Sequence, residues 1–353
     1  MARILIAAGG TGGHVYPGLA VAQYLLAEGH SVHWLGTRRG LEARVIPEAG
    51  IPMHWLQVNG LRGKGWGQRL LAPWMLLRAL WSAWRILRAV RPDVVLGMGG
   101  FVAGPAGVAA WLCRIPLVVH EQNRIPGTTN RWLARIATRV LEGFPGSFPS
   151  QVGAHATGNP LRAGWQQRSA ARAPDAGMRL LIVGGSLGAQ WLNEHVPVAL
   201  AALGRPFSIR HQTGAAMLDE TRQRYATLGM EEAEVCAYID DMQAAYEAAD
   251  LVLCRSGAMT VSELAASGVP SVLIPYPHAI DDHQWHNACY LAAAGAALVE
   301  RQGTLTAERL AEAVAELLDD AGRLRAMSLA ARALARDDAT REVATICLEV
   351  TAS

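Results

Sequence analysis

A glycine-rich loop near the start of the chain carries the first residues able to do chemistry. The loop GGTGGH, Gly9 to His14, follows an apolar run that predicts a strand, and it opens a predicted helix. Glycines let a ligand approach the backbone closely, and free amides at a helix start attract negatively charged oxygens. His14 can act there as a general base, because the positive end of a helix keeps an imidazole neutral. A plain helix-capping role is the alternative for this histidine.

A dinucleotide fits this loop less well. The spacing is not GxGxxG, and the next predicted strand, Val32 to Leu35, is followed by Gly36 instead of an acidic residue that binds a ribose. Dinucleotide binding is therefore the less favoured ligand class.

Two loops in the second half offer a similar setting for phosphate. GGSLG, Gly184 to Gly188, has the same order of strand, glycines and helix, and Ser186 adds a hydroxyl. SGAMTVSE, Ser256 to Glu263, also follows a predicted strand and begins a helix. Ser256, Gly257 and Thr260 of this loop suit a phosphate held by amides and hydroxyls.

Glu263 lies about one turn into that helix. A carboxylate there repels phosphate but accepts hydrogen bonds from two ribose hydroxyls, so we expect a nucleotide ribose beside it. A capping box with Thr260, three residues earlier, is a compatible alternative.

A polar segment, Pro275 to Ala288, follows the predicted strand Ser271 to Ile274. Its acids and histidines lack a recognised metal-ligand spacing, while Gln284 and Asn287 favour contacts with sugar hydroxyls. We therefore expect a sugar site here and no bound metal. The side chains that a metal would need are His278, Asp281, Asp282, His283 and His286.

Two polar segments of the first half complete the candidate site. HEQN, His120 to Asn123, ends the predicted strand Leu117 to His120, at the edge where open α/β sheets bind ligands. Arg162, in GNPLR, can hold a diphosphate through its forked donors. A plain contact between domains is the alternative for this arginine.

Short apolar runs that alternate with helical patterns position all of these loops. They predict βα units on parallel sheets, and therefore an α/β fold. RILIAAGGTGG at Arg3 to Gly13 resembles RLLIVGGSLGA at Arg179 to Ala189, so we expect two Rossmann-like domains. We expect the junction between the two domains within residues 143–178, and we expect the final helix, from about Ala339, to return to the first domain. The predicted strands are Ile4 to Ala8, Val32 to Leu35, Val94 to Leu96, Leu117 to His120, Leu180 to Val183, Asp250 to Leu253 and Ser271 to Ile274.

Composition and charge exclude several classes of protein. The 353 residues, 51% of them hydrophobic, suffice for two domains, and the net charge of +2 is too small for a protein that coats nucleic acid. Five cysteines without a CxxC pair argue against a disulfide framework or a thiolate zinc site. The N-terminus carries no signal-peptide pattern, so a cytoplasmic protein is expected. Glycines and a proline interrupt the uncharged stretch Val94 to Cys113, which predicts a strand, a loop and a helix over Ala106 to Leu112 rather than a membrane span.

The segment Leu70 to Arg91 predicts an amphipathic helix with two apolar faces and no acidic residue. One face is assigned to the core and consists of Leu76, Leu80, Ala83, Leu87 and Val90. The other combines tryptophan with arginine, which suits the headgroup layer of an anionic membrane. Its members are Trp74, Leu77, Arg78, Trp81, Trp84, Arg85 and Arg88, with Arg62, Lys64 and Arg69 as a basic rim upstream. Packing of the tryptophans against protein is the alternative.

In combination these motifs resemble a known family. From Arg3 into the final helix, they are similar to the bacterial cell-wall glycosyltransferases that form lipid II. The motifs, in chain order, are GGTGGHVYPGLA, LRGKG, PDVVLGMGG, HEQN, GNPLR, GGSLGA, YIDDM, CRSGAMTVSELAASGVP and DDHQWHNA. The resemblance implies a GT-B fold of two Rossmann-like domains separated by a cleft. Residues 1–160 with 339–353 would face the acceptor and the membrane, and residues 161–338 would bind UDP-N-acetylglucosamine.

The resemblance also implies an activity. The expected reaction is inverting transfer of N-acetylglucosamine from UDP to the C4 hydroxyl of the muramoyl sugar of lipid I, giving lipid II and UDP in peptidoglycan synthesis. His14 is then the base, with no metal or other cofactor. The expected location is the cytoplasmic face of the inner membrane, as a peripheral protein, with cell-wall or division proteins as further partners.

The same resemblance carries donor contacts onto this sequence. Leu187 and His283 stand where some members have glutamine. The implied contacts are Thr11, Gly12, Gly13, Asn123, Arg162, Ser186, Ile239, Ala258, Met259, Thr260, Val261, Ser262, Glu263 and Gln284.

Two other functional classes stay open. An epimerase of UDP-N-acetylglucosamine would share the nucleotide site but need no lipid-facing surface. A UDP-sugar-binding or scaffold protein would bind without turnover.

Overall fold

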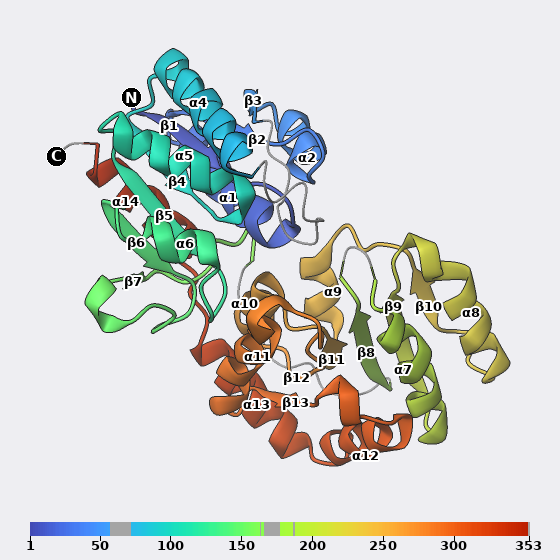
Figure 1. Cartoon of the computed structure of the whole chain (residues 1–353). Helices are drawn as coiled ribbons and strands as arrows, with labels where there is room; N and C mark the ends of the chain where they lie inside the picture. The colour runs from blue at the N-terminus through green and yellow to red at the C-terminus, as the bar shows by residue number, and fades with distance from the viewer. Residues whose placement is uncertain (57–71, 163, 166–176, 186–187, 352–353) are drawn as a thin grey trace. The chain divides into compact units, whose positions relative to one another are not determined.

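The computed structural model describes residues 1–56, 72–162, 164–165, 177–185 and 188–351 (Figure 1). The chain forms two compact units. The N-terminal unit comprises Met1–Ala163 and Asp338–Ser353, and the C-terminal unit comprises Gly164–Asp337.

The N-terminal unit is built on a seven-stranded parallel sheet with the order β3-β2-β1-β4-β5-β6-β7. Its strands are β1 (Arg3–Ala7), β2 (Ser31–Gly36), β3 (Met53–Trp55), β4 (Val94–Gly97), β5 (Leu117–Glu121), β6 (Arg139–Glu142) and β7 (His155–Ala156). Its described helices are α1 (Gly12–Ala27), α2 (Glu42–Glu48), α4 (Ala72–Val90), α5 (Gly100–Leu112), α6 (Thr128–Leu133), the short η1 (Ser150–Val152) and α14 (Ala339–Glu349).

The central strands of this sheet are buried on both faces, which is why they read as continuous apolar runs. Ile4 and Ile6 of β1 face a core shared with α1 and α14. Leu5 and Ala7 face the opposite core, which is shared with α4 and α5. Thus α14, at the end of the chain, packs on α1 near its beginning (Figure 1).

The C-terminal unit repeats this plan on a six-stranded parallel sheet with the order β10-β9-β8-β11-β12-β13. Its strands are β8 (Met178–Val183), β9 (Phe207–Gln212), β10 (Glu234–Cys236), β11 (Leu251–Cys254), β12 (Ser271–Leu273) and β13 (Ala297–Val299). Its described helices are α7 (Gln190–Ala202), η2 (Ala215–Met217), α8 (Leu218–Thr227), α9 (Met242–Ala248), α10 (Ala258–Ser267), η3 (Ile280–Asp282), α11 (His283–Ala293), η4 (Gln302–Thr304), α12 (Ala307–Leu318) and α13 (Ala321–Ala333).

In each sheet the strand order reverses beside the first strand of the unit. β1 pairs with β2 on one side and with β4 on the other, and β8 likewise lies between β9 and β11. Loops at the carboxyl ends of such strands open into the crevice where α/β sheets bind ligands. The loops after β1, β4, β8 and β11 therefore define the ligand edge of each unit.

The prediction of two parallel α/β sheets is confirmed, and each predicted strand appears to within two residues. The stretch from Val94 also splits into strand and helix, but α5 begins at Gly100 rather than Ala106. Pro105 lies inside this helix, where it removes a single intrahelical hydrogen bond. No helix in the described ranges is both long and apolar enough to cross a bilayer.

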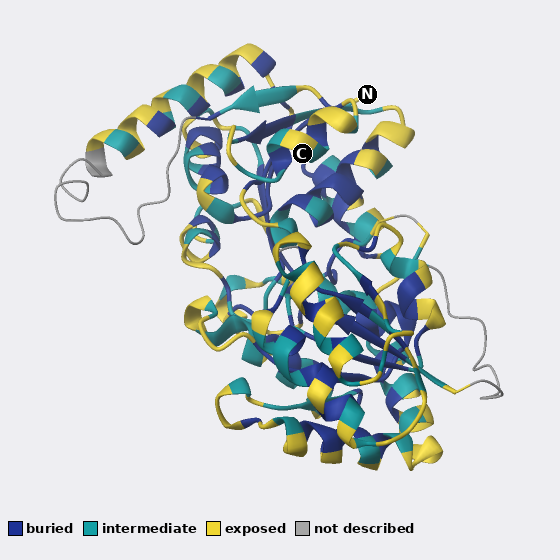
Figure 2. Ribbon diagram, turned by 90° about the vertical axis from the view of Figure 1, so that its right-hand side faces the viewer, coloured by how far each residue is buried: buried dark blue, intermediate teal, exposed yellow. Residues whose placement is uncertain are grey.

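Helix α4 shows one error in the predicted core face. Ala83, Leu87 and Val90 are buried and Leu80 is half-buried, but Leu76 is 50% exposed. The first turns of α4 extend beyond the neighbouring elements (Figure 2), so contact with the core begins only at Ala79. Helical angle alone does not reveal where a neighbour ends.

Candidate active site

His14 lies in the first turn of α1, at the ligand edge of the N-terminal unit. Its Nδ1 is 2.7 Å from Oε1 of Gln122, which directly follows β5. No side chain caps α1, whose cap residue is Thr11, so the capping role considered for His14 is wrong. Gly99, after β4, lies against the ring, since a Cβ there would stand 3.0 Å from the imidazole Nδ1 and Cε1.

Glu42 fixes the glycine loop that precedes His14. Its carboxylate is fully buried and accepts hydrogen bonds from the amide of Gly10 (3.0 Å) and from the amide and hydroxyl of Thr37 (2.8 and 2.7 Å). These bonds satisfy a charge that would otherwise be costly to bury. No sequence pattern predicts this role, because the partners of Glu42 lie in two separate loops.

Glu121 does the same for the segment after β5. This buried carboxylate accepts the amides of Asn123 (2.9 Å) and Gly127 (3.0 Å) and the side-chain amide of Asn130 (2.9 Å). The side chain of Asn123, expected to contact the donor, also donates to Glu121 at 3.2 Å. The segment is therefore held in place without a ligand.

Arg162 lies in the N-terminal unit, where its guanidinium stacks 4.7 Å from the ring centre of Tyr16 on α1. Tyr16 is two residues from His14, so an exposed cation lies close to the predicted base. Thr11 is exposed, and Gly12 and Gly13 are half-buried in the same turn.

In the C-terminal unit, α10 begins directly after β11 and Gly257, and no side chain caps it. Its first turn contains no acidic residue, so the amides of Ala258, Met259 and Thr260 offer a site for anionic oxygens. Because Gly257 occupies the cap position, the capping box considered for Glu263 is wrong.

Two polar residues near this turn have structural partners. The buried Ser256 hydroxyl donates to the backbone carbonyl of Gln284 at 2.8 Å. The buried Asn287 amide donates to the backbone carbonyl of Ser256 at 3.1 Å. These two groups join α11 to the loop after β11, and their expected contacts with phosphate and sugar stay predictions.

Gln284 is half-buried, whereas Ser256 and Asn287 are fully buried. Its Oε1 accepts the backbone amide of Tyr276 at 2.9 Å, which fixes the orientation of a half-buried side-chain amide. Asp281 and Asp282 precede it at φ values of 54° and 50°, a region that non-glycine residues rarely adopt. In the part of the chain that the structure describes, no three acidic, histidine or cysteine side chains gather as a metal would require.

Glu263 lies on α10 beside a buried tyrosine. The Tyr246 hydroxyl is 3.5 Å from Oε2 of Glu263. Burial, with the nearby charge of Glu263, raises the pKa of Tyr246 well above its usual value, so its hydroxyl keeps the proton. Ile239, which follows β10, has a buried side chain, so only its backbone can meet a ligand.

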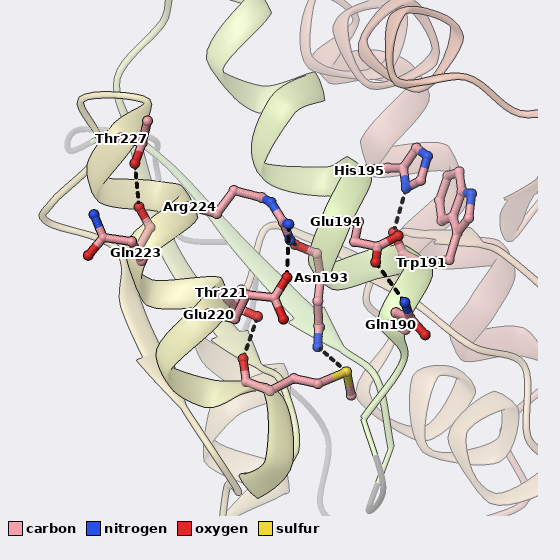
Figure 3. A network of polar contacts seen from close by, with 11 residues as sticks. Gln190, Trp191, Asn193, Glu194, His195, Glu220, Thr221, Gln223, Arg224 and Thr227 are labelled. Atoms are coloured by element: carbon pink, nitrogen blue, oxygen red, sulfur yellow. Dashed lines mark hydrogen bonds and ion pairs between the residues drawn. The ribbon is translucent and has the colours of Figure 1, made fainter.

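Ser186 and Leu187 lie outside the described residues, as do Arg62, Lys64 and Arg69. Gly185, the last described residue before Ser186 in this glycine loop, bonds through its amide and its carbonyl to the side chain of Gln212 (3.2 and 2.9 Å). Figure 3 shows how the helix after this loop is fixed: Arg224 of α8 donates to the carbonyl of Asn193 on α7 at 3.1 Å.

Comparisons with known proteins agree with this geometry. Residues 4–142 match the N-terminal domain of glycosyltransferase family 28, and residues 179–343 match its C-terminal domain. A relative from Methylococcus capsulatus is 58% identical over 98% of both chains, and one from Marinobacter nauticus is 51% identical over 98% of this chain and 97% of its own. Both are named UDP-N-acetylglucosamine--N-acetylmuramyl-(pentapeptide) pyrophosphoryl-undecaprenol N-acetylglucosamine transferase.

Solved structures give the same result. The crystal structure of Acinetobacter baumannii MurG is 38% identical and superposes with a TM-score of 0.85 over 99% of this chain and all of that one. The calicheamicin glycosyltransferase CalG4, at 18% identity and a TM-score of 0.69, shares the fold over 100% of this chain and 98% of its own. The predicted GT-B fold is thereby confirmed. Since the two domain matches run from the first strand into the last helix, the chain belongs to glycosyltransferase family 28.

Proposed function

We propose that this chain transfers N-acetylglucosamine from UDP-N-acetylglucosamine to the C4 hydroxyl of the muramoyl sugar of lipid I, with inversion, giving lipid II and UDP. The observation that carries the proposal is 58% identity over 98% of both chains to a relative whose name states this donor and this acceptor. The uncapped α10 amides and the imidazole at the start of α1 supply groups that such a transfer needs.

On the acceptor side, His14 is the base. The C4 hydroxyl oxygen attacks the anomeric carbon while the bond from that carbon to the diphosphate breaks, and the hydroxyl proton passes to His14. A general base of this kind contributes about 10²- to 10⁴-fold to the rate.

On the donor side, the leaving UDP gains negative charge. In the C-terminal unit the α10 amides from Ala258 to Thr260 stabilise this charge, so no metal is required in principle. Arg162 and Ser186 are further donor contacts that the family resemblance implies. Glu263 binds the ribose and the backbone of Ile239 binds the uracil. Gln284 contacts the sugar, and the family resemblance implies further donor contacts at Thr11, Gly12 and Gly13.

The outer face of α4 docks the enzyme on an anionic membrane at the cytoplasmic face, where the lipid acceptor lies. Trp74, Leu77, Trp81 and Trp84 are 69%, 60%, 57% and 37% exposed. The guanidinium of Arg85 lies 4.8 Å from the ring centre of Trp81, and that of Arg88 lies 5.1 Å from that of Trp84. Rings beside cations suit a headgroup layer, where the ring meets lipid and the cation meets phosphate.

The test is an assay with labelled UDP-N-acetylglucosamine in the presence and absence of lipid I. We expect labelled lipid II and UDP only when lipid I is present. Epimerised UDP-sugar formed without lipid I would replace the proposal with an epimerase. Tight binding of the donor without turnover in either condition would replace it with a binding protein.

A further inference from the structure

A buried chain of hydrogen bonds leads from the backbone to His14. Its first member is His120 on β5, which is fully buried, with Nε2 at 2.9 Å from the carbonyl oxygen of Gly158. A carbonyl only accepts, so Nε2 of His120 carries a hydrogen. Burial lowers the pKa of His120 to about 4, so the ring is neutral near pH 7 and its Nδ1 is an acceptor.

Gln122 is the second member, and two acceptors fix its orientation. Its Nε2 lies 3.0 Å from the carbonyl oxygen of His120 and 3.0 Å from Nδ1 of His120. Both are acceptors, so the NH₂ group must face them and Oε1 must face away. Because Gln122 is fully buried, water does not compete for these bonds.

The orientation of Gln122 determines which ring nitrogen of His14 carries a hydrogen. Oε1 of Gln122, 2.7 Å away, can only accept, so Nδ1 of a neutral His14 must carry the hydrogen. Within the described residues the imidazole makes no other hydrogen bond, and Gly99 packs against its Nδ1 and Cε1 edge. The lone pair of the neutral ring is therefore on Nε2.

We propose that Gln122 and His120 are positioning residues that hold His14 in its Nδ1–H tautomer, so that Nε2 is the atom that accepts the proton from the acceptor hydroxyl. The catalytic part of this inference rests on the proposed function, whereas the tautomer follows from the contacts alone. In the opposite tautomer Nε2 would carry a hydrogen and could not accept a proton, although the site would look unchanged in shape.

The first test reads the tautomer directly in the full-length protein. Long-range ¹H–¹⁵N spectra of the ¹⁵N-histidine-labelled enzyme show which ring nitrogen is protonated, and the His14→Gln variant assigns the signal. We expect a protonated Nδ1 and a bare Nε2 on His14, and loss of this single tautomer in Gln122→Leu. His211, buried in the C-terminal unit with Nδ1 at 3.0 Å from the Tyr225 hydroxyl, is the internal control and should not change. A protonated Nε2 on His14 in the parent protein would overturn the inference.

The second test measures turnover with lipid I. Gln122→Leu should lower kcat about 10- to 100-fold, within the range of a general base, and leave the donor KM within about twofold. Gln122→Glu keeps an acceptor beside Nδ1 but adds a charge that stabilises the imidazolium, so the acid limb of the pH–rate profile should move to higher pH. A purely structural role would not move that limb, and an unmoved limb together with parental kcat in Gln122→Leu would refute the positioning role. Complete absence of lipid II synthesis by the parent protein would instead refute the proposed function, while the spectra would still decide the tautomer.

Discussion

Replacing Trp81 and Trp84 of α4 together with serine should release the protein from anionic vesicles. The rings are 57% and 37% exposed, so together they expose about the surface of one whole tryptophan. That surface is about 200 Å², which at about 25 cal/mol per Å² corresponds to about 5 kcal/mol for complete transfer out of water. Rings that enter only the headgroup layer realise about half of this, so vesicle affinity should fall about 30- to 100-fold.

The double variant separates the apolar contribution from the electrostatic one. Arg85 and Arg88, which stack on the replaced rings, stay in place and are each worth about 1 kcal/mol at most near an anionic surface. The remaining binding should therefore be weak and should disappear as salt rises.

Sedimentation with anionic phospholipid vesicles at physiological salt measures the effect. The matched control is Leu329→Ser on α13, which removes a 65% exposed apolar side chain from the C-terminal unit and should not alter binding. UDP affinity, measured by calorimetry, should be the same in all three proteins. If the double variant pelleted as the parent does, this face of α4 would not be the membrane site.

Four further outcomes are expected. His14→Ala should lower kcat by about 10²-fold or more with UDP binding nearly intact; near-parental turnover would exclude it as the base. Glu263→Ala should weaken donor binding by about 1.5 to 3 kcal/mol, and unchanged affinity in calorimetry would reject the ribose contact. Transfer should persist after exhaustive chelation with EDTA, whereas loss that a divalent ion restores would require a metal. Below pH 6.5 the unfolded chain gains protons that buried His120, with a pKa of about 4, does not accept, so stability should fall by up to about 3 kcal/mol as the pH approaches 4. The free energy of unfolding, measured with urea at each pH, should depend less steeply on pH in His120→Gln than in the parent protein. An equally steep dependence in the variant would contradict the low pKa of His120.

The elements that sequence predicts well are those whose burial is uniform. β1, β4, β8 and β11 are buried on both faces almost throughout, so they appear as apolar runs. β9, at Phe207–Gln212, mixes Arg210 and His211 with apolar residues and was not predicted. Its position depends on pairing with β8, which lies some thirty residues earlier and leaves no local pattern.

The candidate site shows the same limit at the level of side chains. Glycine loops and helix starts were predictable because they are backbone features with a fixed sequence spacing. The direction of a polar side chain was not predictable from the sequence. Ser256 and Asn287 bind backbone carbonyls of the protein, although their residue types suit a ligand. Gln122 was equally hidden, since its role depends on His14, 108 residues away in sequence.

The ligand edges of the two units differ in their charged groups: one has buried carboxylates bound by amides, and the other has an uncapped helix start. In the N-terminal unit, Glu42, Glu121 and Glu142 are buried at the carboxyl edge of the sheet, where a diphosphate-bearing acceptor would be repelled by bare carboxylates. Backbone amides bind all three, including those of Gly146 at 2.6 Å and Phe148 at 3.0 Å to Glu142, so their charge serves to fix loops.

In the C-terminal unit, α10 carries no acid in its first turn and no side-chain cap, so its positive end is left for a ligand. For the proposed transfer, this difference matches the two tasks. The leaving diphosphate needs amides that no side chain has already bound, whereas the proton acceptor needs a fixed neighbour, here Gln122, that keeps one of its nitrogens free of hydrogen. The two parallel-sheet units thus support different chemistry, because different side chains lie at their ligand edges.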